Sequence, residues 1–181
     1  KPEGVKTIVF IYYIKATLKP IAKRLDSLGI RYGVFTGDDK TANEEGYVDS
    51  IDEFINGDTD VLIATIQCAG TGIDGLQAIC NRAIFFQLPW TATEFEQSIG
   101  RLDRDGTAFD KVQVYIPSTY ITLPNSTIWS WCESKMRRIN SKRDIARAAV
   151  DGEIPDPSAV LTPQEATKYW IGWLERLDAA A

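Results

Sequence analysis

The feature that most constrains the fold of this chain is an alternation between short apolar runs and segments of helical periodicity. The apolar runs are rich in β-branched and aromatic residues, and they occur at residues 7–13, 32–35, 60–65, 82–87 and 112–116. Strands that are separated by helices usually pair in parallel, and both faces of such a sheet are covered. We therefore predict the α/β fold class, with a mainly parallel sheet between helices.

Turn and capping signals delimit the predicted helices. The first helix is expected to accommodate Pro20 in its first turn and to end at Gly29. The second is predicted to begin at a Thr-x-x-Glu capping box at residues 41–44 and to end at Asn56, and the third to begin at a similar box at residues 91–94. The apolar face of the first helix consists of Leu18, Ile21, Leu25 and Leu28.

A different pattern begins after residue 116, where Pro117 and Pro124 interrupt the chain. Two longer helical stretches follow with no strand between them, and the first aligns Ile128, Cys132, Met136, Ile139, Ala146 and Val150 on one side. Between residues 135 and 147 this stretch holds six Lys and Arg residues against one Asp, a net charge of +5 in a chain of −5. We predict an α/β domain at residues 1–117 and a helical extension at residues 118–181.

The composition excludes several kinds of chemistry. The chain contains no histidine, so it can form neither a Ser-His-Asp nor a Cys-His catalytic group. Its three cysteines stand far apart, and we therefore predict no metal site. No apolar run reaches the roughly 20 residues that span a bilayer, so we expect a soluble, intracellular protein. The sequence begins with Lys1, and its only methionine is Met136, so we expect a fragment of a longer chain.

A glycine-rich turn follows the third predicted strand. Residues 70–75, Gly-Thr-Gly-Ile-Asp-Gly, match the G-x-G-x-x-G pattern of dinucleotide-binding turns. That function needs a long helix directly after the third glycine, and only residues 76–81 separate it from the next strand. A connecting turn is therefore the simpler interpretation, and the dinucleotide site is rejected.

A second motif occupies residues 97–106, Gln-Ser-Ile-Gly-Arg-Leu-Asp-Arg-Asp-Gly. If a helix continues through it, Gln97, Arg101 and Arg104 lie on one face. Gly100 weakens such a helix and suggests either an ending there or a functional approach of the backbone. Two interpretations stay open at this point: a solvated face with an ion pair from Arg101 to Asp105, or arginines that neutralise phosphate charge.

These two motifs, in this order, resemble motifs V and VI of the C-terminal domains of superfamily-two helicases. Residues 61–74 resemble motif V, and residues 97–106 resemble motif VI, which is the more specific of the two. Residues 7–13 resemble motif IV, and Thr36 and Gly37 occupy the place of the phosphate-contacting turn after the next strand. The resemblance implies a RecA-like motor domain.

Within this superfamily the chain is similar to Swi/Snf-type translocases. Residues 83–90, Ala-Ile-Phe-Phe-Gln-Leu-Pro-Trp, resemble their aromatic P-W-N-P region, and the helices of residues 118–181 resemble their brace. The chain departs from the Swi/Snf pattern at Ala69, at Asp74 and in residues 103–106, and Asp74 matches the wider superfamily instead. The resemblance to the superfamily is therefore closer than the resemblance to the subfamily.

The resemblance also implies roles for individual residues. Arg101 and Arg104 would act as catalytic arginine fingers on the γ-phosphate of ATP. Gln97, Gly72 and Asp74 would bind the nucleotide, and Thr36, Gly37, Thr65, Gln67, Arg137 and Arg138 would bind nucleic acid. The chain has no G-x-x-x-x-G-K-[ST] loop, so ATP and Mg²⁺ are expected to be held mainly by an N-terminal RecA-like domain of the same protein. The implied nucleic acid is DNA, double-stranded in the Swi/Snf case, or RNA. The implied location is cytoplasmic (nucleoid-associated) or nuclear.

Other interpretations remain beside this one. A non-catalytic RecA-like module that binds nucleic acid or protein would share the fold without a working motor. Loop capping explains Thr36 and Thr65 equally well, and a solvated face explains the basic residues near Arg137 and Arg138. The tryptophans Trp90, Trp170 and Trp173 are expected in the core, because large aromatic side chains are mostly buried.

Overall fold

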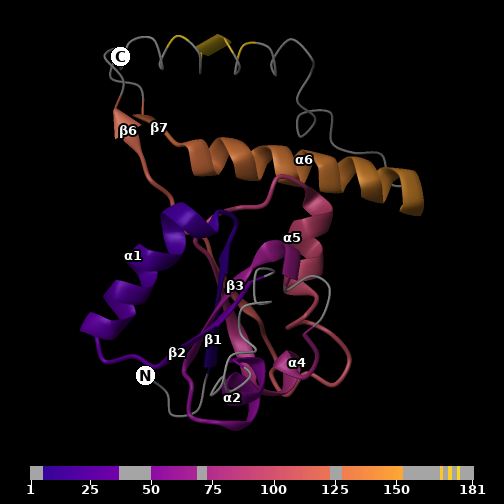
Figure 1. Ribbon diagram of the computed structural model, residues 1–181. Coiled ribbons are helices and arrows are strands. Elements are labelled where there is room, and N and C mark those ends of the chain that lie inside the picture. The colour runs from indigo at the N-terminus through magenta and orange to yellow at the C-terminus, as the bar shows by residue number, and fades with distance from the viewer. Residues whose placement is uncertain are drawn as a thin grey trace. The chain divides into compact units, whose positions relative to one another are not determined.

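A computed structural model of the chain describes residues 6–36, 50–68, 73–122 and 128–152, together with Lys168, Ile171, Gly172 and Glu175 (Figure 1). The strands of the main sheet are β1 (Lys6–Ile11), β2 (Tyr32–Phe35), β3 (Val61–Thr65), β4 (Cys80–Phe85) and β5 (Gln113–Tyr115). The helices that connect them are α1 (Ile14–Ser27), α2 (Ser50–Asn56), α4 (Leu76–Ile79) and α5 (Ala92–Ile99). All five predicted strand positions are confirmed, with ends that shift by one or two residues.

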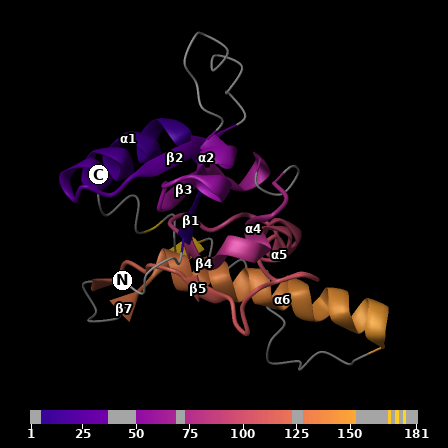
Figure 2. The same ribbon diagram turned by 90° about the horizontal axis from the view of Figure 1, so that it is seen from below.

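The main sheet has the strand order β2-β3-β1-β4-β5, and every pairing in it is parallel. Figure 2 shows α1 on one side of the sheet and α2, α4 and α5 on the other. This division follows from right-handed crossovers, because the connection through α1 runs across the sheet in the opposite direction to the others. The predicted α/β class, with a mainly parallel sheet between helices, is confirmed.

Side chains on the two faces of β1 form the core on both sides of the sheet. Val9 and Ile11 pack with Ile63 on the face covered by α1, where Leu18, Ile21 and Leu25 contact them. On the other face the rings of Phe10 and Phe85 lie 4.7 Å apart, as do those of Phe85 and Phe95. Parallel strands buried on both faces need such continuous apolar runs, which is why these segments read so clearly in the sequence.

Two details of α1 differ from the prediction. The helix begins at Ile14, so Pro20 lies inside it rather than in its first turn. Leu28 is the C-cap residue and is exposed, so it does not belong to the apolar face. The expected ending is confirmed, because Gly29 adopts a φ of 64°, which glycine alone tolerates without strain.

The chain after β5 contains short strands that the sequence did not reveal. β6 (Ile121–Thr122) and β7 (Ile128–Trp129) form an antiparallel pair. Ile128 is therefore an exposed strand residue, and the predicted helical face that began with it is wrong at this position. The long helix α6 (Trp131–Asp151) follows, and Val150 near its end is exposed as well.

The chain divides into two compact units, Lys1–Cys132 and Glu133–Ala181. This division falls later than the predicted boundary at residue 117. The start of the second helix at residues 41–44 and the tryptophans Trp170 and Trp173 lie outside the described residues. Among the helices that are described, none is long and apolar enough to cross a membrane.

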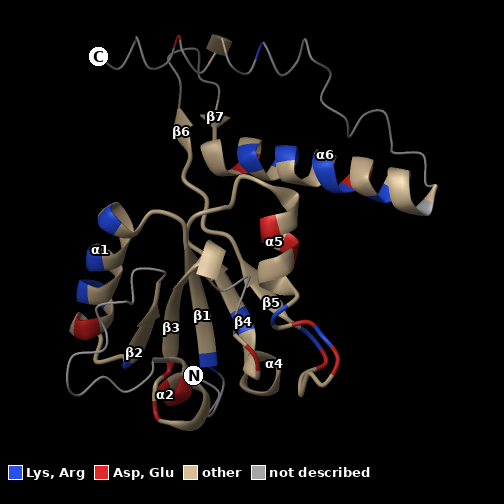
Figure 3. Cartoon of the chain, turned by 45° about the vertical axis from the view of Figure 1, so that its right-hand side comes forward, with Lys and Arg blue, Asp and Glu red and all other residues tan. Residues whose placement is uncertain are grey.

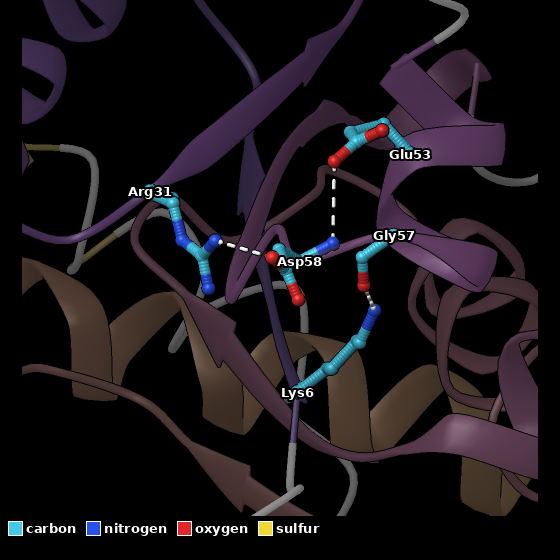
Figure 4. Close-up of polar contacts among 5 residues, drawn as sticks. All are labelled: Lys6, Arg31, Glu53, Gly57 and Asp58. Atoms are coloured by element: carbon cyan, nitrogen blue, oxygen red, sulfur yellow. Dashed lines mark hydrogen bonds and ion pairs between the residues drawn. The ribbon is translucent and has the colours of Figure 1, made fainter.

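Polar contacts fasten the amino-terminal ends of β1, β2 and β3 around the loop after α2 (Figure 4). The ammonium of Lys6 donates hydrogen bonds to the carbonyl oxygens of Phe54 and of Gly57, the latter at 2.8 Å. The Glu53 carboxylate accepts from the backbone N–H of Asp58 at 3.2 Å, and the Asp58 carboxylate pairs with Arg31 at 3.0 Å. Lys6 is half-buried, whereas the Arg31–Asp58 pair is largely exposed, so Lys6 is the stronger contact.

Replacing Lys6 with Met should therefore lower the free energy of unfolding. The two carbonyl oxygens would lose a charged donor, a change that costs about 1–3 kcal/mol. Urea denaturation of the chain measures this effect. Lys23→Met is the matched control, because Lys23 is exposed on α1, and it should stay within about 0.5 kcal/mol of the parent. Equal stability of the two variants would contradict the role of Lys6.

Cys80 offers a second test of the packing. Burial raises the pKa of its thiol from 9.0 to about 11, and the protonated thiol donates a hydrogen bond to the Arg82 carbonyl at 3.4 Å. Burial thus favours the protonated thiol, so its contribution to stability is complete below pH 9 and is lost as the pH rises towards about 11. At pH 8 iodoacetamide should modify the half-buried Cys68 and Cys132 and leave Cys80 intact until the chain is unfolded. Mass spectrometry of the alkylated chain would reveal any modified Cys80.

Candidate functional site

The capping box at the start of α5 sets the position of the motif that follows it. The Thr91 hydroxyl accepts from the Glu94 backbone N–H at 3.1 Å, and the Glu94 carboxylate accepts from the Thr91 backbone N–H at 3.2 Å. Both reciprocal bonds of the predicted box are therefore present. Phe95 and Ser98 are buried, so this face of α5 is fixed against the sheet.

The helix ends before it reaches the two arginines. α5 stops at Ile99, and Gly100 is its C-cap. The backbone N–H groups of Leu102 and Asp103 both donate to the Ile99 carbonyl, at 2.8 and 3.0 Å, and the Leu102 side chain is fully buried. The arrangement of Gln97, Arg101 and Arg104 on one helical face is therefore wrong, whereas the ending suggested by Gly100 is confirmed.

The turn after α5 brings the two helicase-like motifs together. The Arg104 guanidinium contacts the Asp74 carboxylate at 2.9 Å, and the two side chains are 41% and 81% exposed. The backbone N–H of Ala108 donates to the Gln77 carbonyl at 3.1 Å, which ties the same turn to α4. Residues thirty positions apart in the sequence thus form one charged, accessible site. Gln97 is exposed and Arg101 half-buried, and Gly72 lies outside the described residues.

The short helix α4 supports the rejection of a dinucleotide site. It comprises only Leu76–Ile79, and β4 begins at the next residue. Its N-cap residue Gly75 adopts a φ of 86° without any side-chain cap. A helix of one turn does not provide the extended N-terminus that holds a pyrophosphate.

The candidate nucleic-acid residues lie at the opposite edge of the sheet. Thr36 follows β2, and Thr65 and Gln67 end or follow β3, so they occupy the carboxyl-terminal edge. Asp74 and Arg104 precede β4 and β5, at the edge where Figure 3 shows α2, α4 and the charged turn after α5. Because all five strands are parallel, the two groups of residues are separated by the length of the sheet.

These residues differ in how much surface they present. The side chains of Thr36 and Thr65 are buried, and among the described atoms the Thr65 hydroxyl oxygen has no hydrogen-bond partner. Gln67 is exposed, and Gly37 lies outside the described residues. Contact with a ligand at Thr36 and Thr65 would therefore rely on backbone groups in this conformation.

The basic residues on α6 form a separate feature of the second compact unit. Arg137 and Lys142 are exposed and Arg138 is half-buried, and Figure 3 shows Lys and Arg along the middle of the helix. Ile139 is buried, so the helix has at least one packed position. The described geometry of α6 by itself is compatible with either a phosphate-binding or a solvated face.

Two surface features of the first unit were missed from the sequence. Lys15, Lys19 and Lys23 are exposed at intervals of four residues along α1, a spacing that could have revealed them. Trp90 was expected in the core, but it is 41% exposed. Trp90 follows the end of β4 and lies outside the paired part of the sheet. The size of its side chain was therefore a poor guide to its burial.

Comparisons with known proteins agree with this geometry. A family model described as the helicase conserved C-terminal domain matches residues 1–106. The chain is 28% identical over 167 residues to the ATP-dependent RNA helicase RhlB of Xanthomonas oryzae, a match that covers 88% of this chain and 27% of that protein. It is 36% identical over 118 residues to the uncharacterized ATP-dependent helicase YqhH of Bacillus subtilis, which covers 65% and 20%. The chain thus spans about a quarter of the length of these relatives.

A solved structure shares the fold. The C-terminal domain of the DEAD-box protein Dbp5 aligns with a TM-score of 0.53 and 22% identity, over 75% of this chain and 68% of that one. At this level of identity the likeness concerns the fold alone. It supports the prediction that the five-stranded parallel sheet and its helices have a RecA-like fold.

The Asp74–Arg104 ion pair should matter little for folding. An exposed pair contributes about 0–1 kcal/mol, so Asp74→Asn should change the free energy of unfolding by no more than that. Chemical denaturation of the parent and the variant measures the difference. A loss of several kcal/mol would mean that the pair holds the turn together, and the accessible charges would then have a structural role.

Proposed function

Because the chain belongs to the helicase conserved C-terminal domain family, we propose that it is the second motor domain of an ATP-dependent nucleic-acid helicase or translocase. In this function the site around Arg104 completes an ATP site whose other half is an N-terminal RecA-like domain. The contact between Asp74 and Arg104 carries the proposal, because it unites the two motifs in one accessible site.

The chemistry of Arg104 suits a phosphate in transfer. A guanidinium has five N–H donors in a planar fork, and the described bond to Asp74 engages one of its nitrogens. The side chain is also partly exposed, so it can reach a ligand outside the domain. Arg104, with Arg101 in the same turn, would stabilise the negative charge that develops on the γ-phosphate.

The remaining groups of this site would hold the nucleotide rather than react with it. The exposed Asp74 carboxylate can accept hydrogen bonds from ribose hydroxyls. Gly72 belongs to the same motif as Asp74, Gln97 belongs to the motif of Arg104, and both would add nucleotide contacts. ATP supplies the free energy of the motor, with Mg²⁺ on its phosphates. Since the chain has no phosphate-binding loop, the N-terminal domain would hold both.

Separation of the two sites explains how hydrolysis could drive movement. The nucleotide site lies at one edge of the sheet, and Thr36, Gly37, Thr65 and Gln67 lie at or next to the other. A rigid sheet between them would transmit closure of the ATP cleft to the nucleic-acid backbone. Arg137 and Arg138 on α6 would add contacts to phosphates, which carry no sequence information.

RNA is the track that the relatives favour. RhlB is named an RNA helicase, and this relative matches most of the chain. The Swi/Snf-like residues 83–90 favour double-stranded DNA instead, as in the translocases that they resemble. We propose RNA, and a comparison of ATPase stimulation by RNA and by duplex DNA decides between the two subfamilies.

Replacing Arg104 with Ala in the full-length protein tests the proposed site. An arginine finger acts in the transition state, so kcat should fall by about 10³-fold or more while KM for ATP changes far less. Lys at this position should rescue poorly, because a point charge does not reproduce the planar fork. Steady-state ATPase assays with saturating RNA measure both constants.

Arg31→Ala is the matched control for this experiment. Arg31 also forms an exposed ion pair with an aspartate, at 3.0 Å, so its loss has the same cost for folding without touching the site. Its kcat should remain close to that of the parent. If Arg104→Ala is folded and equally active, the finger role is wrong, and a non-catalytic binding module becomes the better description.

A further inference from the structure

Three large aromatic side chains are exposed at the carboxyl-terminal edge of the sheet. Tyr13, Phe86 and Trp90 are 52%, 50% and 41% exposed. We propose that they form a base-stacking surface for an unpaired stretch of the nucleic-acid strand. This inference rests on the proposed function and specifies its substrate, a single strand with accessible base faces rather than an intact duplex.

The backbone holds these side chains in neighbouring positions. Tyr13 follows β1 and Phe86 follows β4, and these two strands are paired at the centre of the sheet. The side-chain oxygen of Gln87 accepts hydrogen bonds from the backbone N–H groups of Tyr12 and Tyr13, both at 2.8 Å. This bridge locks the end of β1 to the segment after β4, so the two rings are presented from a rigid base.

Further aromatic residues extend the surface beyond Trp90. The rings of Trp90 and Trp131 lie 6.3 Å apart in an edge-to-face arrangement, and those of Trp129 and Trp131 lie 6.2 Å apart. Trp131 is itself 39% exposed. Aromatic side chains of this size are more often buried, so a group of partly exposed rings around Trp90 indicates a binding surface.

Positive charge continues from the same edge. α1 begins at Ile14, directly after Tyr13, and exposes Lys15, Lys19 and Lys23 along one side with no acidic residue in its first turn. Alternation of flat aromatic surfaces with lysines matches the alternation of bases with phosphates in a single strand. This complementarity of charge favours nucleic acid over an apolar protein partner, which would leave the lysines unused.

The position of the rings also agrees with the predicted backbone contacts. The order of the strands places the ends of β2 and β3, with Thr36 and Thr65, beside the ends of β1 and β4. Adjacent strands are about 4.8 Å apart, so the edge from β2 to β4 spans roughly 14 Å, the length of two to three extended nucleotides. A single nucleic-acid strand can therefore place its phosphates at the ends of β2 and β3 and its bases at the ends of β1 and β4.

The experiment compares two labelled 12-nucleotide probes with the full-length protein: oligouridylate and an abasic ribose-phosphate strand of the same length. The parent should bind the strand with bases at least about tenfold more tightly, because stacking on aromatic side chains has this effect for each base. The double variant Tyr13→Leu, Trp90→Leu should lose about tenfold or more of this preference. Its slope of log K against log salt should not change, since that slope counts phosphate contacts.

Two further variants separate stacking from folding. Tyr13→Trp keeps a flat ring and should retain the preference for the strand with bases. Leu28→Ala removes an exposed apolar side chain at the other end of α1 and should leave both affinities unchanged. Each variant must give a circular dichroism spectrum close to that of the parent, which shows that it is folded.

The outcomes distinguish this inference from the function on which it rests. Equal binding of both probes by the parent would overturn the stacking surface and leave the motor domain intact. An unchanged preference in the double variant would also overturn it and would assign this edge to a protein partner instead. Equal losses for both probes would overturn it as well, because they would reflect general disruption of this edge. A parent that binds neither probe would overturn the inference and the proposed nucleic-acid function together.

Discussion

Burial of β1 between β3 and β4 is the constraint on which the rest of the structure depends. Ile8, Phe10 and Ile11 are fully buried, and the strand is paired on both sides. Its alternate side chains support both layers of helices, so the segments next to its two ends take their positions from this strand. Lys6 at its beginning fastens the loop after α2, and the residues after its end are fastened by Gln87.

A parallel sheet with this central strand separates two kinds of chemistry. Polar chemistry gathers at the amino-terminal edge, where Asp74 and Arg104 meet. Aromatic surface and basic charge gather at the carboxyl-terminal edge, near Tyr13 and α1. In the proposed function, the same rigid element connects the proposed phosphate-transfer site with the proposed single-strand surface. In a motor domain this separation lets the free energy of a reaction at one edge change the affinity for nucleic acid at the other.

Local patterns predicted much of this architecture and failed where long-range contacts decide. The strands of the sheet were readable because burial on both faces demands continuous apolar runs, and the capping box of α5 was readable because its bonds span three residues. The prediction that Gln97, Arg101 and Arg104 share one helical face was wrong. The helix ends at Gly100, and the chain then turns so that Leu102 is buried. Trp90 was predicted in the core because of its size. The sequence alone does not show that the segment after β4 leaves this side chain partly exposed.

The sequence by itself determined the fold class, the order of the strands along the chain and the motifs that relate it to helicases. These depend on residue type and on short spacings, which propensity and periodicity govern. Only the tertiary structure decided that Asp74 contacts Arg104, and that Gln87 bridges the ends of β1 and β4. Such contacts depend on the spatial order β2-β3-β1-β4-β5, which brings distant segments together through parallel pairing and right-handed crossovers. No local pattern encodes a distance between residues thirty or seventy-five positions apart.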